Sequence, residues 1–192
     1  MWRTDHSLKT TSNQAMTYGI SLWLPFYGTG TIAAENSGSF YDSEPDKAVV
    51  PYCCWSDVTP SLVCLFDVRI KDRDYDTIRR LIEGWRKMNK FYYGDYYPLT
   101  PYSLDETAWI GWQFNAPEKA GGMIQMFRRP HSYFEAARFK LRGLEANAKY
   151  VFTELNSNRS VGKTGRKLME KGLLVTIDEC PGAVVYTYRK VK

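Results

Sequence analysis

The amino-acid sequence predicts an α+β protein: a partial (β/α) barrel segment of two strands and one or two helices, followed by an antiparallel β-sandwich. The first half alternates continuous apolar runs with an amphipathic helix, which is typical of parallel strands and their connecting helices. The second half is a series of short segments in which apolar and polar residues alternate, which is typical of a sandwich. The hydrophobic pattern changes near residues 96–101. We therefore expect residues 1–95 to be the C-terminal portion of a (β/α)8 barrel and residues 96–192 to be the sandwich.

The first half has a helix end, two strands and one long connection. We expect a helix to end near Gly19 and a long polar loop, rich in glycine and serine, to separate the strands. The second strand is a continuous apolar run, as in parallel strands buried on both faces. In order, the expected elements are a helix end at 12–18, a strand at 20–25, the loop at 27–57 and a strand at 62–66.

The clearest helix of the chain covers residues 72–89. Asp72 and Asp74 provide capping oxygens and favourable charge at its start. Tyr75, Ile78, Ile82 and Trp85 recur at spacings of three and four residues, with Leu81 and Met88 alongside them, and form one apolar stripe.

Two parallel strands do not close a barrel, which needs eight. The apolar faces of such strands need neighbours that we do not find in this sequence, so the first half resembles a piece of a larger barrel. An apolar face that is left open favours association, so we expect self-association through the exposed barrel faces.

The second half alternates with period two, as in antiparallel strands with one wet face. Turn signals such as Gly121-Gly122 and Pro181-Gly182 separate these strands. The expected strands are 109–114, 123–128, 137–141, 150–155, 173–177 and 184–188. Gly162-Lys163-Thr164 resembles the end of a phosphate-binding loop, but Ser157 stands where that motif requires glycine, so we expect a hairpin loop.

Composition argues against several classes of protein. The net charge is +5 and the basic residues are spread along the chain, so we expect no nucleic-acid partner. No apolar stretch of about 18 residues occurs, so we expect no membrane span. The cysteines Cys53, Cys54, Cys64 and Cys180 lack a CxxC spacing and histidines beside them, so we expect no metal and no cofactor.

Aromatic residues make up 15% of the chain, which suits a β-rich core and also a sugar-binding surface. Two functions outside catalysis stay open on this basis. One is a non-catalytic carbohydrate-binding protein, and the other is a structural or interaction protein.

An ordered set of motifs carries a family resemblance. In chain order, the set is Trp2-Arg3-Thr4-Asp5, Asn13-Gln14, the segment 18–30, Pro60-Ser61-Leu62-Val63, Asp67-Val68-Arg69, Arg79-Arg80-Leu81-Ile82, the segment 94–103, Trp112-Gln113-Phe114-Asn115, Phe127-Arg128-Arg129-Pro130 and the segment 138–144. Read together, they resemble the end of the catalytic barrel and the C-terminal β-sandwich of glycoside hydrolase family 36, which consists mainly of α-galactosidases (melibiases).

The resemblance implies a retaining glycosidase acting on α-galactoside-type sugars. Asp5 matches the family's acid/base aspartate, with Thr4 where serine is more usual. The family's nucleophile, an aspartate of an earlier barrel strand, matches no residue of this sequence. Without that neighbouring charge, we expect Asp5 to keep a pKa close to about 3.9 and to be ionised. The isolated chain should therefore be inactive.

The resemblance also suggests where substrate is bound. Barrel enzymes place their sites at the carboxyl ends of the strands. With a strand expected at 20–25, Phe26 and Tyr27 follow its end and are candidates for lining the sugar pocket. Asp67, after the second strand, is a weaker candidate for the same rim.

Overall fold

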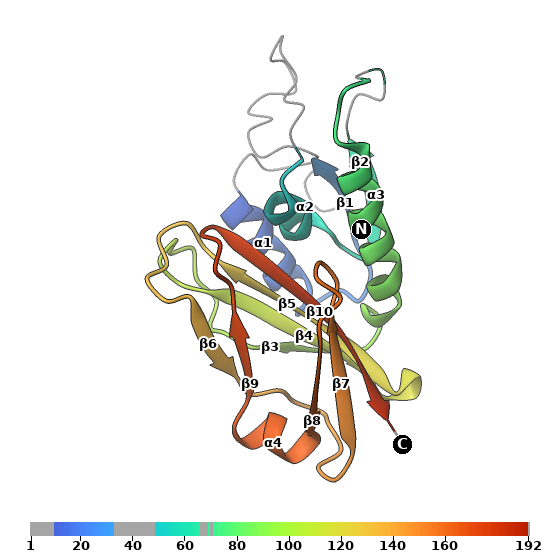
Figure 1. The fold of residues 1–192 in the computed structure, drawn as a ribbon, viewed down its shortest axis with the longest axis vertical. Coiled ribbons are helices and arrows are strands. Elements are labelled where there is room, and N and C mark those ends of the chain that lie inside the picture. Colours follow the sequence, from blue (N-terminus) through green and yellow to red (C-terminus); the bar gives the residue numbers. More distant parts are fainter. Residues whose placement is uncertain (1–9, 33–48, 66–68, 70, 192) are drawn as a thin grey trace.

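The parallel and antiparallel strands of the chain occupy separate regions of the molecule (Figure 1). The computed structural model describes residues 10–32, 49–65, 69 and 71–191. Within these residues, two parallel strands and three helices form one region, and antiparallel sheets form the other. The predicted α+β class is confirmed, and no barrel closes within the described residues.

The first region follows the order helix, strand, helix, strand, helix. β1 and β2 are hydrogen-bonded in parallel, with Gly28 opposite Ser61. The bounds are α1 Thr10–Ile20, β1 Gly28–Ile32, α2 Pro51–Asp57, β2 Ser61–Leu65 and α3 Tyr75–Met88. The predicted helix end before residue 20 is confirmed, as are the second strand and the helix predicted at 72–89.

The capping and the apolar stripe predicted for α3 are both present. The side chain of Asp74 accepts a hydrogen bond from the backbone N–H of Thr77 at 2.9 Å. Ile78, Leu81 and Met88 are buried on the face that turns inward. Local sequence signals are therefore sufficient to predict this helix.

The strand predicted at 20–25 is wrong. α1 continues to Ile20, and the backbone N–H of Leu24 donates to the Ile20 carbonyl at 2.9 Å, which closes a turn. Leu22 and Trp23, which looked like a buried strand, are 56% and 84% exposed. The strand lies instead in β1, inside the stretch expected to be a loop, because pairing with β2 overrides the weak strand preference of its glycines.

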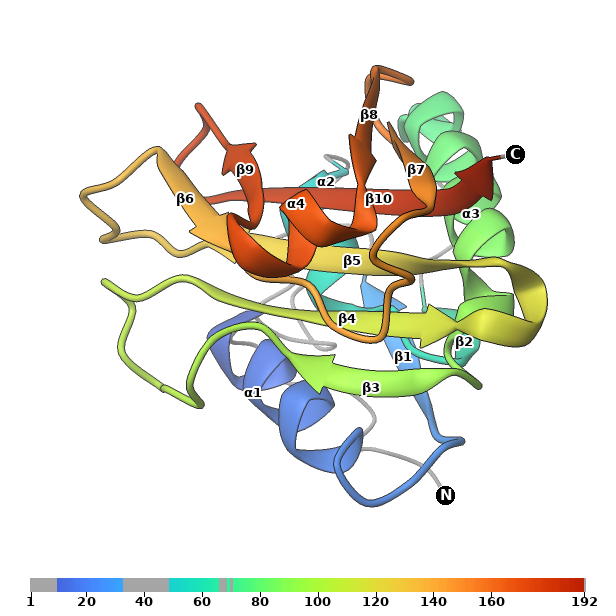
Figure 2. The same cartoon turned by 90° about the horizontal axis from the view of Figure 1, so that it is seen from below.

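The antiparallel strands form a six-stranded sheet and a two-stranded sheet (Figure 2). The large sheet has the order β3-β4-β5-β10-β7-β8, and the small one pairs β6 with β9. The bounds are β3 Asp95–Pro98, β4 Ile110–Ala116, β5 Gly121–Arg128, β6 Ala136–Phe139, β7 Lys149–Glu154, β8 Ser160–Thr164, α4 Gly165–Glu170, β9 Leu173–Thr176 and β10 Gly182–Val191. Two 3₁₀ turns, Asn89–Phe91 and Pro117–Lys119, complete the described elements.

All the strands predicted in the second half are present, with ends that differ by up to three residues. β3, α2 and α4 were not predicted, and Gly162-Lys163-Thr164 lies in β8 rather than in a hairpin loop. That segment pairs with β7, and the side chain of Thr164 caps α4.

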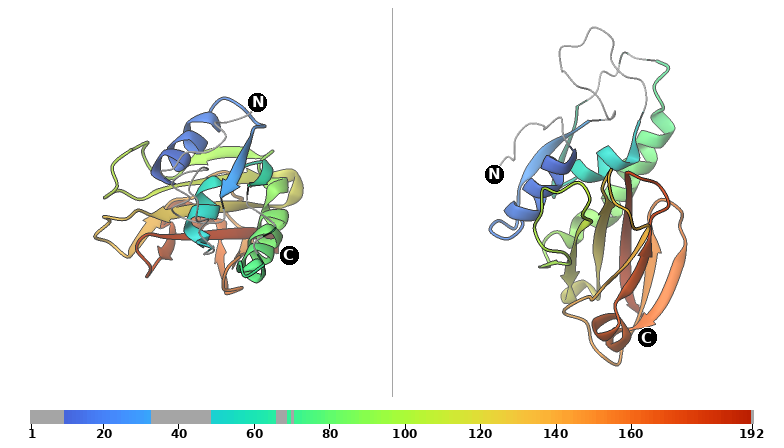
Figure 3. Two further views of the ribbon diagram at one scale, coloured as in Figure 1. Left: turned by 90° about the horizontal axis from the view of Figure 1, so that it is seen from above. Right: turned by 90° about the vertical axis from the view of Figure 1, so that its left-hand side faces the viewer.

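The expectation of one wet face is wrong for the centre of the large sheet. Every residue of β4 is buried. Ile110, Trp112 and Phe114 pack with the helical region, whereas Ile124 and Met126 of β5 pack with the small sheet and α4. Both faces are covered because helices α1–α3 lie on one side and β6, β9 and α4 lie on the other (Figures 2 and 3).

The two regions share one core. Tyr52 and Trp55 of α2 pack with Trp112, Phe127 and other aromatic residues of the sheet. The segment after α3 joins the two regions, since Phe91 and Tyr92 are buried in this core. The large sheet begins at Asp95, beside the predicted domain boundary, but division into domains 1–95 and 96–192 stays a prediction. The described helices include none long and apolar enough to cross a membrane.

Candidate functional site

The carboxyl ends of β1 and β2 define the edge at which barrel chemistry is expected. The end of α1 lies beside the start of β1. The hydroxyl of Tyr27, the residue before β1, is 2.6 Å from Oγ of Ser21, the residue after α1. In Figure 1, α1 and α3 both start toward the end at which β1 and β2 finish. We call this end, from Ile32 and Leu65 of the strands to Thr10 of α1, the strand-end edge.

Two predicted acidic residues are close in sequence to residues of this edge. Asp5 precedes the first residue of α1 by five positions, and Asp67 follows the last residue of β2 by two. Both lie outside the described residues. Their positions in the sequence are consistent with the strand-end edge, and their roles stay predictions.

Phe26 and Tyr27 lie at the opposite end of the parallel pair. They precede β1, so they are at the amino end of the strand rather than after its carboxyl end. Tyr27 is 1% exposed, whereas Phe26 is about half exposed and stacks on Tyr93 with ring centroids 6.1 Å apart. The premise that placed them beside the sugar was therefore wrong, and their contact with substrate stays without a structural argument.

A buried polar cluster fixes α1 to the large sheet. The guanidinium Nε of Arg129 donates to Gln14 Oε1 at 3.0 Å, and Gln14 Nε2 donates to the hydroxyls of Tyr52 and Ser56 at 2.9 Å each. Both Arg129 and Gln14 are fully buried. These residues come from two of the motifs that carried the family resemblance, Asn13-Gln14 and Phe127-Arg128-Arg129-Pro130, and the fold brings them together.

The same arginine also orders the loop between β3 and β4. Its Nη1 donates to the backbone carbonyls of Ser103 and Asp105 at 2.8 and 3.0 Å. Glu106 of this loop accepts a hydrogen bond from Thr11, in the first turn of α1, at 3.3 Å. The start of α1, and with it one side of the strand-end edge, is therefore held by the antiparallel sheet.

Burial controls the protonation of this cluster. Desolvation lowers the pKa of Arg129, although a guanidinium stays charged in proteins. Desolvation also raises the pKa of the Tyr52 hydroxyl, so that it stays neutral. The cluster is a fixed positive charge with neutral partners, which suits anchoring rather than proton transfer.

The described carboxylates with shifted pKa values do not resemble a general acid. Hydrogen bonds from Thr77 lower the pKa of Asp74, and hydrogen bonds from Thr107 lower the pKa of Asp105. A general acid needs a raised pKa. In the described part of the chain, no three histidine, cysteine or carboxylate side chains gather where they would hold a metal ion.

A second anchoring point lies beneath α2. Gln125 of β5 is fully buried, and its Oε1 accepts hydrogen bonds from Trp112 Nε1 at 2.9 Å and from the hydroxyl of Tyr92 at 3.1 Å. Its Nε2 donates to the backbone carbonyl of Trp55 at 3.3 Å. Gln125 and α2 were not predicted from the sequence. An isolated glutamine on a strand gives no signal of its own until its partners are known.

Solved structures show which larger fold contains this arrangement. The chain superimposes on the α-galactosidase from Lactobacillus brevis with a TM-score of 0.72 at 13% identity, covering 96% of this chain and 25% of that one. The galactosidase domain of the α-galactosidase–sucrose kinase AgaSK gives a TM-score of 0.64 at 18% identity, with the same coverage. The family 36 α-galactosidase AgaA from Geobacillus stearothermophilus, in a structure with stachyose, gives 0.69 at 14% identity.

The chain has the fold of one quarter of a family 36 α-galactosidase. This is consistent with the C-terminal part that the motifs predicted, and the chain spans about 25% of the length of the solved structures that it matches. No protein-family model and no curated protein matches the sequence. At identities of 12–18%, the family 36 likeness is a likeness of fold.

Proposed function

We propose that this chain is the C-terminal part of a retaining α-galactosidase-type glycoside hydrolase, with residues 1–95 in the catalytic barrel and residues 96–192 in the sandwich. One observation supports the proposal most directly. The two parallel strands β1 and β2 and the helices that run opposite to them pack on an antiparallel sheet, in the arrangement found in family 36 enzymes. Two of those structures contain raffinose and stachyose, so the proposed substrates are α-galactosides.

The incomplete barrel supports the same proposal. Within the described residues, β1 and β2 each have one hydrogen-bonded neighbour, each other. Parallel sheets are covered on both faces and extended at both edges in (β/α) folds. We propose that these outer edges pair with the other strands of the barrel. When those strands are missing, the same edges would mediate self-association.

Asp5 is the acid/base in this proposal. Five residues span at most about 18 Å, so a carboxylate five positions before Thr10 stays within reach of the strand-end edge. The sheet fixes α1 through Arg129 and Gln14, which gives that segment a rigid support. The C-terminal sandwich would then contribute by positioning rather than by chemistry.

The reaction requires a second carboxylate. In a retaining glycosidase, the nucleophile attacks the anomeric carbon from a carboxylate about 5–5.5 Å away from the acid/base. The acid/base protonates the departing oxygen and then removes a proton from water as the glycosyl-enzyme is hydrolysed. The negative charge of the nucleophile keeps the acid/base protonated. Because no nucleophile was recognised in this sequence, the chain on its own should not turn over substrate.

The test uses leaving groups of different basicity. In an assembly that supplies the remaining barrel strands, Asp5→Asn should lower turnover of raffinose by about 10²–10⁴-fold. Turnover of dinitrophenyl α-galactoside should fall much less in its first step, because that leaving group departs without a proton. Asp178→Asn, an exposed aspartate after β9, serves as the control and should leave both rates unchanged.

Two results would count against the proposal. Hydrolysis of nitrophenyl α-galactoside by the isolated chain that disappears in Asp5→Asn would contradict the inactivity of the chain on its own, since the chain would then hold a complete site. The other is an equal loss for both leaving groups, since an acid must discriminate between them.

A further inference from the structure

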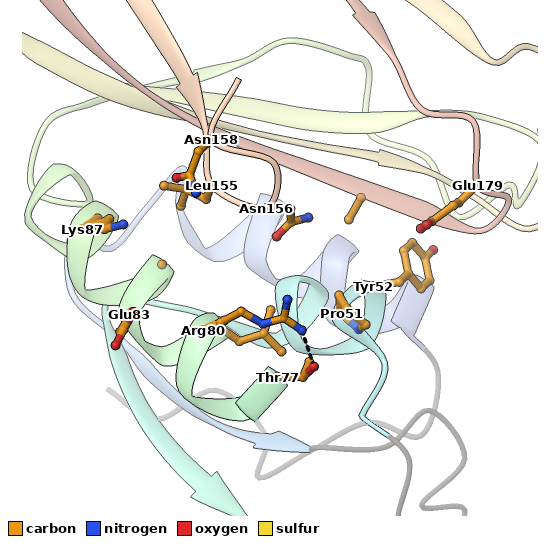
Figure 4. A pocket seen from close by; sticks show the side chains of 13 residues that line it. Pro51, Tyr52, Thr77, Arg80, Glu83, Lys87, Leu155, Asn156, Asn158 and Glu179 are labelled. Carbon is orange, nitrogen blue, oxygen red and sulfur yellow. Dashed lines mark hydrogen bonds between the residues drawn. The ribbon is translucent and has the colours of Figure 1, made fainter. Parts of the chain in front are cut away.

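A groove separates α3 from the turn between β7 and β8 (Figure 4). Its volume is about 280 Å³, just below the range of small-molecule sites, roughly 300–1,000 Å³. It joins the two regions of the molecule, because one wall comes from the helical region and the other from the antiparallel sheet.

The construction of the groove depends on one glycine. A Cβ at Gly84 of α3 would lie 2.7 Å from Cη2 of Trp55, so only glycine lets α3 pack this closely on α2. The indole Nε1 of Trp55 donates to Asn156 Oδ1 at 3.1 Å, which ties the turn after β7 to the same support. The apolar part of the lining includes Leu81, Gly84, Leu155 and Ala183.

Hydrogen-bonding groups of both kinds line the walls. Arg80 and Lys87 of α3 are donors, Glu179 is an acceptor, and the amides of Asn156 and Asn158 are both. Figure 4 shows the side chains of Arg80 and Asn156 extending toward one another across the groove. Arg80 Nη2 donates to Thr77 Oγ1 at 2.6 Å, which steadies the guanidinium and leaves further N–H groups for a ligand.

The charges select the class of ligand. Arg80 and Lys87 are balanced by Glu83 and Glu179, so a strongly anionic or cationic ligand would meet like charge on one side. A neutral ring with many hydroxyl groups matches the polar lining residues with its hydroxyls and the apolar ones with its C–H face. The geometry points to a binding site for one unit of a neutral saccharide in this groove, distinct from catalysis.

The indole of Trp55 is a built-in reporter. Because its N–H donates to Asn156, a ligand that contacts the Asn156 amide should move the indole resonance in ¹⁵N–¹H spectra. Titration of the full chain with D-galactose should give a saturable shift of this resonance at millimolar concentration. Sodium sulfate, titrated at constant ionic strength, should give no such shift.

Matched arginine variants locate the binding. Arg80→Gln should weaken galactose binding at least fivefold. Arg79→Gln, one residue earlier, should leave it unchanged, because Arg79 is exposed, pairs with Asp76 and does not line the groove. Asp5→Asn should also leave it unchanged, which separates this site from the proposed catalytic one.

Several outcomes would overturn the assignment. They are no saturable shift of the Trp55 resonance with galactose, a shift with sulfate alone, or equal weakening by Arg79→Gln and Arg80→Gln. Loss of binding in Asp5→Asn would do so as well, because it would place the sugar at the strand-end edge.

Discussion

The two regions of the molecule differ in how they complete their own structure. In the large antiparallel sheet, the central strands are hydrogen-bonded on both sides and buried on both faces within the described residues. In the parallel pair, each strand has one neighbour there, and α2 packs against β5 and β10 of the sheet. The sheet is therefore the scaffold, and the parallel pair is held in place by it.

Removing the Phe127 ring should weaken the contact between the two regions most strongly. The Phe127 ring is fully buried, packs edge-on against Tyr52 of α2 at 6.2 Å, and lies 5.4 Å from Trp112. We expect Phe127→Ala to lower the free energy of unfolding by about 3–5 kcal/mol, measured by urea denaturation. The control Leu174→Ala, 46% exposed in β9, should change it by less than about 1 kcal/mol.

Fluorescence and circular dichroism should give coincident transitions for the unmodified chain, because the regions share one core. If the helical signal is lost well before the sheet signal, the regions unfold separately, and the view of the parallel pair as part of one cooperative unit is wrong.

Arg129 tests the polar part of the same contact. Arg129→Met keeps the bulk of the side chain but leaves Gln14 Oε1 and the carbonyls of Ser103 and Asp105 without their donor. We expect a loss of about 1–3 kcal/mol, with faster amide exchange concentrated in α1. Arg138→Met, an exposed arginine of β6, is the control. Equal exchange throughout the chain in both variants would contradict a specific anchoring role.

The contrast between the regions also explains how far the sequence could predict them. β9 carries its own period-two pattern, with Leu173 and Val175 buried and Leu174 and Thr176 exposed, and α3 carries its cap and stripe. β1 has neither signal: its sequence, Gly-Thr-Gly-Thr-Ile, becomes a strand because β2 lies beside it. The exposed run at Leu22 and Trp23 imitated a strand because hydrophobicity alone does not distinguish burial from exposure.

The candidate sites show the same limit. The motifs around Gln14 and Arg129 were found in the sequence as separate pieces, and their contact is a property of the fold. Phe26 and Tyr27 were expected after a strand at 20–25, but the strand lies at Gly28–Ile32, so both residues precede it. The groove beside α3 joins residues from four distant segments, and no local pattern marks it.

Substitution of Asp74 should have the smallest effect on stability. It tests the N-terminal cap of α3, a feature of the helical region that the local sequence predicts. The folded pKa of Asp74 is lowered by the hydrogen bond from Thr77, so its stabilising contribution is present above the unfolded pKa of about 3.9 and is lost as pH falls through the lower folded value. Asp74→Asn keeps a capping oxygen and should flatten the acid limb of the urea midpoint against pH. Asp74→Ala should flatten it too, and should also lower the midpoint at neutral pH. An acid limb in Asp74→Asn as steep as that of the unmodified chain would show that other carboxylates control this pH range.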